Sequence, residues 1–282
     1  MERSTVESYH HERNMLHSLA VFRQHLDALQ SRCALVDART YIECREGRRL
    51  SKPPVLLTFD DGYADFMTVV LPELSARGLP CALFPTMAPV VERFVPPADQ
   101  VYALLAADYG GSRRLDDSDR KSWVGGALKK AMLQASPDEQ SAMIGNLADS
   151  LELTRPMAGP AHLTERDIAE LPSGVYVGAH GLYHHEFGSL GIDQLRGELC
   201  RILVWIKGLR PTQDQGVWLA YPNGKANRAV QPDAVTDLVR EAGVDYAFVA
   251  SSCPDERNKG DLEIMRLFSH DDLTRFNHCW NE

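Results

Sequence analysis

Short, continuous apolar runs bounded by turn residues recur along the chain and predict strands buried on both faces. They lie in PPVLLTFDDG (53–62), PCALFPT (80–86), SGVYVGAH (173–180), GVWLAYP (216–222), VDYAFVAS (244–251) and LEIMRLFS (262–269). Between them, apolar residues spaced three and four apart predict amphipathic helices over 15–29, 67–78, 192–209 and 234–243. Strands that alternate with helices indicate parallel pairing through right-handed crossovers. The pattern predicts an α/β fold and is compatible with an open sheet or a closed barrel.

The stretch from about 92 to 168 interrupts this alternation. It is polar and mostly helical in pattern, in ADQVYALLAADYG and then in SWVGGALKKAMLQASPDEQSAMIGNLADSLEL. We interpret it as a helical insertion into a single domain that spans 1–282 and has its core at about 50–275. Insertions at strand ends commonly shape access to a site, and a protein-interaction surface is a second role open to this one.

Composition narrows the class of partner. The 282 residues include 30 Lys plus Arg against 39 Asp plus Glu, a net charge of −9, with no basic stripe, so we expect no nucleic-acid partner. The polar start lacks the apolar core of a secretion signal, and no stretch approaches the about 20 apolar residues of a membrane span. We therefore expect a cytoplasmic protein. The cysteines form no CxxC pair and are predicted to be mostly reduced core thiols: Cys33, Cys44, Cys81, Cys200, Cys253 and Cys279.

Two polar clusters close two of the predicted strands. Asp60 and Asp61 end the first, and His180 and His184 begin a turn after the third, four residues apart as metal-binding pairs often are. Adjacent carboxylates raise the pKa of one of them unless they share a cation or a proton. The carboxyl ends of parallel strands meet on one face, so we expect the clusters to come together. Two imidazoles and one carboxylate would leave an open position for water, the pattern of a catalytic zinc site.

These motifs resemble a known family. LTFDDGY (57–63) is similar to the first motif of the polysaccharide deacetylases that share the NodB homology domain, carbohydrate esterase family 4. HGLYH (180–184) resembles their second motif, H-[ST]-x-x-H, and LAYPNG (219–224) falls where the family has R-x-P-[FY]-G. LFSHD (267–271) resembles the last motif. Four matches in the family's order are more specific than any one of them.

The resemblance implies a metal-dependent N-deacetylase on a distorted (β/α)7 barrel of the NodB type. It implies that Asp61, His180 and His184 hold a divalent metal, most simply Zn²⁺, with Co²⁺ or Ni²⁺ as alternatives. Asp60 would be the general base and His270 the general acid. The backbone N–H of Asn223 would help to polarise the acyl oxygen, and Tyr221 is the neighbouring candidate for substrate contact.

The chain departs from the family pattern at three positions. Gly181 stands in place of Ser or Thr, Asn223 replaces the aromatic residue, and Ala220 stands where many members have an arginine that holds the base. We expect Arg266, four residues before His270, either to restore a positive charge near Asp60 or to serve as a surface or cap residue.

The leading hypothesis is hydrolysis of the acetamide of an N-acetylated amino sugar, a sugar conjugate or a small natural-product intermediate. Two alternatives stay open: a metal-dependent amidohydrolase for a non-sugar C–N bond, and a catalytically impaired binding protein on the same scaffold. The expected partner is a small molecule or a glycan, and a homo-oligomer is left open.

Overall fold

The computed structural model describes residues 18–112, 114–155, 159–210, 212–225, 232–251 and 260–267. The predicted general acid His270 lies outside the described residues, as do Cys253 and Cys279. Among the described helices, none is long and apolar enough to cross a membrane.

Eight described strands form three small sheets, and every strand pair is parallel. The strands are β1 (Ala34–Leu35), β2 (Pro54–Val55), β3 (Thr58–Asp61), β4 (Cys81–Pro85), β5 (Val175–Val177), β6 (Trp218–Ala220), β7 (Tyr246–Ser251) and β8 (Ile264–Leu267). Their orders are β1-β2, β3-β4-β5 and β6-β7-β8. The six predicted strands are therefore confirmed. The short β1 comes in addition, and the 53–62 run is divided into β2 and β3.

The two larger sheets are linked at the point where the histidine motif begins. Ala179 forms an isolated parallel bridge with Leu219, and its carbonyl oxygen accepts a hydrogen bond from Ala220 N at 2.8 Å. No ladder joins β8 to β3 within the described strands. Instead, the Arg266 side chain reaches from β8 to Thr58 and Asp60 on β3. The α/β class with parallel strands is confirmed, whereas the closed (β/α)7 barrel is not.

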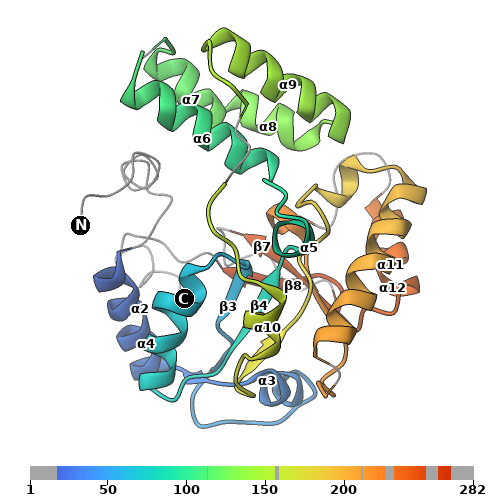
Figure 1. Cartoon of the computed structure of the whole chain (residues 1–282). Coiled ribbons are helices and arrows are strands. Elements are labelled where there is room, and N and C mark those ends of the chain that lie inside the picture. Colours follow the sequence, from blue (N-terminus) through green and yellow to red (C-terminus); the bar gives the residue numbers. More distant parts are fainter. Residues whose placement is uncertain are drawn as a thin grey trace.

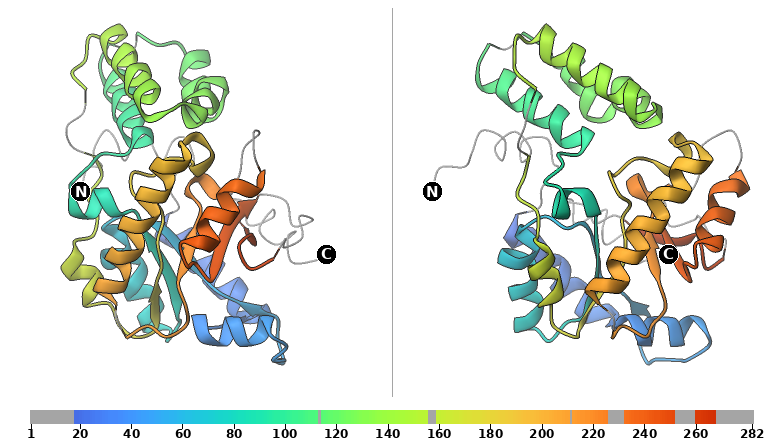
Figure 2. Two further views of the ribbon diagram at one scale, coloured as in Figure 1. Left: turned by 90° about the vertical axis from the view of Figure 1, so that its right-hand side faces the viewer. Right: turned by 45° about the vertical axis from the view of Figure 1, so that its right-hand side comes forward.

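Helices cover the sheets on their outer sides (Figures 1 and 2). They are α2 (Leu19–Arg32), α3 (Ala38–Arg45), the π-helical turn η1 (Phe66–Val70), α4 (Leu71–Ala76), α5 (Met87–Val91), α10 (Glu165–Ala169), η2 (Phe187–Ser189), α11 (Ile192–Leu209), η3 (Pro222–Gly224) and α12 (Pro232–Glu241). The predicted periodicity is evident in α11, where Leu195, Leu199 and Ile202 are buried. The main core lies between these helices and strands that are buried along their whole length, such as β4.

The predicted insertion contains four further helices at one end of the molecule (Figure 1). These are α6 (Pro97–Gly110), α7 (Asp117–Gly125), α8 (Ala127–Gln134) and α9 (Pro137–Ser150). They enclose a hydrophobic core of their own, with Leu105, Trp123 and Ile144 at its centre. A buried ion pair between Arg120 and Asp108 lies beside this core. The insertion therefore has a hydrophobic core that is separate from the core of the α/β part.

The described cysteines are all free thiols. Cys33 and Cys81 are buried, as predicted for core thiols, and burial raises the pKa of the Cys81 thiol to about 12. Cys44 is half-buried, and Cys200 is exposed because it lies on the outer side of α11. The expectation of core thiols is thus wrong for Cys200.

Candidate active site

The end of β3 turns sharply and presents two carboxylates. Asp61 has φ 68° and Gly62 has φ 79°, which is left-handed backbone that glycine adopts readily and other residues rarely do. A side chain at Gly62 would also meet Pro85 Cβ at 2.8 Å. Glycine is therefore required at position 62, and the strained Asp61 backbone is typical of a functional position.

The histidine loop that follows β5 is shaped by a second left-handed turn. Gly181 has φ 85°, and a Cβ atom there would lie 3.0 Å from Pro222 Cγ. His184 itself has φ 63°. Glycine in place of the family's Ser or Thr is therefore explained by the backbone of this loop rather than by a lost hydroxyl contact.

His180 is held in a defined tautomer. Its Nδ1 lies 2.8 Å from the carbonyl oxygen of Ala220, and because a carbonyl can only accept, Nδ1 carries the proton. The lone pair then lies on Nε2, which is 3.5 Å from Asp61 Oδ1. Such an outer hydrogen bond is how proteins orient a metal-ligating imidazole.

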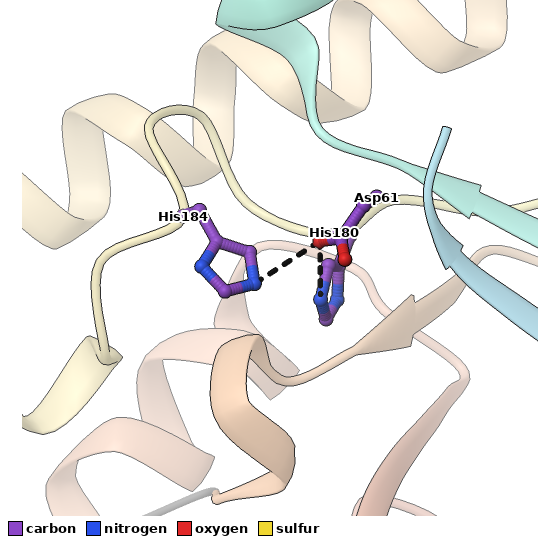
Figure 3. A group of neighbouring side chains, drawn as sticks. All are labelled: Asp61, His180 and His184. Atoms are coloured by element: carbon purple, nitrogen blue, oxygen red, sulfur yellow. Dashed lines mark ion pairs between the residues drawn. The ribbon is translucent and has the colours of Figure 1, made fainter. Parts of the chain in front are cut away.

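Asp61, His180 and His184 converge on one point (Figure 3). One ligand atom from each lies within 4.8 Å of the others, and His184 Nε2 is 3.1 Å from Asp61 Oδ1. A tetrahedral shell with bonds of about 2.0–2.1 Å places neighbouring ligand atoms about 3.3 Å apart. The 3.1 Å and 3.5 Å separations bracket that value, so the donor set fits a small divalent cation.

The charges of this cluster are strongly coupled. Burial alone would raise the pKa of the Asp61 carboxyl, but His184 and then His180 hold it well below its ordinary value. Burial lowers the pKa of His180 despite the nearby carboxylates, which favours the neutral, ligating form. For His184, burial is outweighed by Asp61, and its pKa is raised. A cation bound here would take the place of the proton that His184 shares with Asp61.

Asp60 lies beside this cluster and is paired with Arg266. The guanidinium donates from Nη1 to Oδ1 at 2.7 Å and from Nη2 to Oδ2 at 2.8 Å, a bidentate arrangement. Arg266 also stacks near the rings of Phe84 and Phe248. Burial would raise the pKa of Asp60, but Arg266 and then His180 lower it below its ordinary value. The sequence alternative of a surface or cap role for Arg266 is wrong, because its side chain is only 11% exposed and points at Asp60.

The aromatic ring of the third motif lies in the protein core. The ring of Tyr221 is fully buried in the core, edge-to-face with Phe187 at 5.8 Å. The prediction that Tyr221 contacts substrate is therefore corrected: its side chain packs in the interior. Asn223 lies in η3 with φ 56°, and its buried Nδ2 has no hydrogen-bond partner among the described residues. Donation from the backbone N–H of Asn223 to the acyl oxygen stays a prediction.

Three residues that the sequence analysis did not select lie next to Asp61. The Tyr63 hydroxyl donates to Asp99 Oδ1 at 2.9 Å, which ties the start of α6 to the DDG turn. The Tyr63 ring stacks on His162 at 4.6 Å, and His162 Nε2 is buried without a partner. Burial raises the pKa of Asp99 to about 6. Tyr63 is the last residue of the first motif, but no local pattern could have revealed Asp99 or His162, because both are far away in sequence.

Comparison with known proteins gave structural matches only. No protein-family model matches the chain, and no curated protein matches it by sequence. A de-N-acetylase from Aggregatibacter actinomycetemcomitans superposes with a TM-score of 0.59 at 14% identity, covering 93% of this chain and 89% of its own. The Streptococcus pyogenes deacetylase PplD, solved with acetate, gives a TM-score of 0.58 at 14% identity, covering 94% of this chain and 86% of its own.

IcaB from Ammonifex degensii is a third similar structure, with a TM-score of 0.56 at 16% identity, covering 93% of this chain and 88% of its own. Each of these three matches covers 93% or more of this chain. The chain therefore has an α/β fold similar to that of solved deacetylases.

Proposed function

We propose that this chain belongs to the polysaccharide deacetylase family and is a metal-dependent N-deacetylase. The observation that carries the proposal is the convergence of Asp61, His180 and His184 beside a carboxylate, Asp60, that is held by an arginine. The fold likeness to deacetylases supports the same reading. The substrate would be the acetamide of an N-acetylated amino sugar, a sugar conjugate or a small natural-product intermediate.

Asp61, His180 and His184 would hold the metal, for which the mixed N and O donor set favours Zn²⁺ over harder cations, with Co²⁺ or Ni²⁺ as alternatives. When bound, such a cation supplies Lewis acidity toward an acyl oxygen and makes a water molecule more acidic. The Ala220 carbonyl keeps His180 Nε2 free to ligate.

The remaining residues would manage protons and charge. Asp60 would accept the proton of the attacking water, and Arg266 keeps that carboxylate ionised and oriented without occupying all of its lone pairs. The Asn223 N–H would donate to the developing oxyanion. His270 would protonate the departing amine, as the resemblance of LFSHD to the last motif implies.

The chain would act as one domain, 1–282, with the helical insertion beside the site. The proposed partner is a small molecule or a glycan rather than nucleic acid. The cytoplasmic location and the oligomeric state stay predictions.

The direct test is acetate release from a panel of N-acetyl sugars and small N-acetyl amides by the purified chain loaded with Zn²⁺. Release from sugars supports the proposal. Release from non-sugar amides alone identifies an amidohydrolase of another kind, and ligand binding without release identifies a binding protein. Asp60→Asn should keep the metal and lose turnover, and retained turnover would exclude Asp60 as the base.

A further inference from the structure

A cavity of about 280 Å³ lies between the helical insertion and the histidine loop. Its lining includes Gln100 from α6, Gln140 and Ser141 from α9, Arg155, and Tyr183 and His185 from the histidine loop. Two parts of the chain with separate hydrophobic cores therefore meet around one hollow space. Small-molecule sites are common at such junctions.

Two segments that line the cavity also carry residues of the candidate active site or its surroundings. Tyr183 and His185 flank His184, one of the three proposed metal ligands. On the opposite wall, Gln100 follows Asp99, whose carboxylate accepts the hydrogen bond from Tyr63 beside the DDG turn. A substrate that reached both places would have its acetamide at the metal site and another substituent in this cavity.

Arg155 is the charged residue of the lining, and it is fixed in place by neutral partners. Its Nε donates to Gln100 Oε1 at 2.6 Å, and its Nη1 donates to Ser141 Oγ at 2.8 Å. Gln100 is itself anchored, because its Nε2 donates to Val95 O at 2.7 Å. No carboxylate pairs with Arg155, and no acceptor takes a hydrogen bond from its Nη2, among the residues that the structure describes.

A half-buried guanidinium without a counter-charge is costly, because removing a cation from water without a paired anion is unfavourable. Two other arginines of the insertion have carboxylate partners: Arg114 pairs with Glu152, and Arg120 pairs with Asp108. Arginine held in a fixed orientation is well suited to a carboxylate or phosphate group. An anion that arrives with a ligand would supply the missing counter-charge.

The rest of the lining suits the body of a sugar. Gln100, Gln140 and Ser141 bring amide and hydroxyl groups to the lining. Phe94 and Tyr183 meet edge-to-face at 5.0 Å and give the cavity an aromatic wall. Amide groups and aromatic rings together match the hydroxyls and apolar faces of a carbohydrate.

We propose that this cavity is a substrate subsite that binds an anionic substituent, a phosphate or a carboxylate, on the N-acetylated sugar, with Arg155 as the residue that recognises the charge. This proposal rests on the proposed deacetylase function, and it narrows the substrate class to negatively charged N-acetyl sugars.

The test measures binding to the Zn²⁺-loaded full chain by calorimetry, with three probes: N-acetylglucosamine, its 6-phosphate, and N-acetylmuramic acid, which carries a carboxylate. One charge-assisted contact should make a charged probe bind about tenfold more tightly than the neutral one. A preference for the 6-phosphate or for the carboxylate identifies which anion the cavity takes. Equal affinity for all three probes would overturn the proposal.

Variants assign the effect to Arg155. Arg155→Gln should abolish the preference by weakening the binding of the charged probes, whereas the control Arg114→Gln, in the same insertion but outside the cavity, should keep the preference. In case Arg155→Gln does not fold, Ser141→Asp places a carboxylate against the guanidinium and should abolish the preference too, while Ser141→Asn should retain it. A preference that survives both Arg155→Gln and Ser141→Asp would refute the role of Arg155.

Acetate release separates this proposal from the proposed function. If charged probes bind through Arg155 but no acetate appears from any of them, the cavity proposal stands and the deacetylase function fails. If neutral and charged sugars bind and release acetate equally well, the function stands and the cavity proposal fails.

Discussion

Replacing Arg266 should reveal how Asp60 is kept ionised. Arg266→Met removes the only described cation that forms a hydrogen-bonded pair with Asp60, while the apolar side chain can still pack near Phe84 and Phe248. Asp60 would then retain its burial, which raises its pKa, without the arginine that lowers it. The pKa of Asp60 should therefore rise in the variant.

The magnitude follows from the geometry of the pair. Two charge-assisted hydrogen bonds of 2.7 Å and 2.8 Å are lost, but the Asp60 side chain is 31% exposed, so water screens part of the interaction. We therefore expect about 2 kcal/mol less stabilisation of the carboxylate, which makes the ratio of ionised to protonated Asp60 roughly 30-fold smaller at a given pH.

The assay is the pH dependence of kcat/KM for acetate release. The acidic limb should move to higher pH in Arg266→Met, so the deficit grows as pH falls and is smallest near neutrality, where Asp60 is ionised in both proteins. The control is Arg45→Met on α3, which breaks a partly buried pair with Asp261 elsewhere in the molecule and should leave the limb in place. An acidic limb that does not move in Arg266→Met would refute the reasoning.

Two further variants test the surroundings of the site. The folded-state pKa of Asp99, about 6, lies above its ordinary 3.8, so the folded protein binds this proton more tightly than the unfolded chain does. The resulting contribution to stability is complete below about pH 4 and is lost as pH rises through 6. Asp99→Asn should match the wild type in urea unfolding at pH 4 with EDTA and exceed it by up to about 3 kcal/mol at pH 7, and equal stabilities at pH 7 would contradict this. Gly181→Ser should lower Tm more than Gly47→Ser, since both have positive φ but only Gly181 faces Pro222 at 3.0 Å, and similar losses would show that the close approach is unimportant.

The sequence was informative where the signal is local. Continuous apolar runs located the strands correctly, because a strand buried on both faces, such as Cys81–Pro85, must be apolar at successive positions. The rule that parallel strands end on one face correctly predicted that Asp61 and His180 lie close together, although 118 residues lie between them in the sequence. The two-residue strand Ala34–Leu35 was missed because it is too short to show a period.

Features that depend on side-chain direction or distant contacts could not be predicted. Tyr221 follows a strand in a motif, and nothing local indicates that its ring turns into the core. The pairs Tyr63–Asp99 and Arg155–Gln100 join segments that meet only after the insertion packs. Gly181 looked like a loss against the family pattern, whereas its positive φ makes glycine the fitting residue.

The most direct test of the central claim is the metal content of the purified chain after incubation with Zn²⁺ and removal of excess ion, measured by elemental analysis. We predict one zinc ion per chain in the wild type and in the control His185→Ala, and loss of that ion in His180→Ala and in His184→Ala. Zinc that stays at one equivalent in both ligand variants, or that never binds the wild type, would contradict a metal site built from Asp61, His180 and His184.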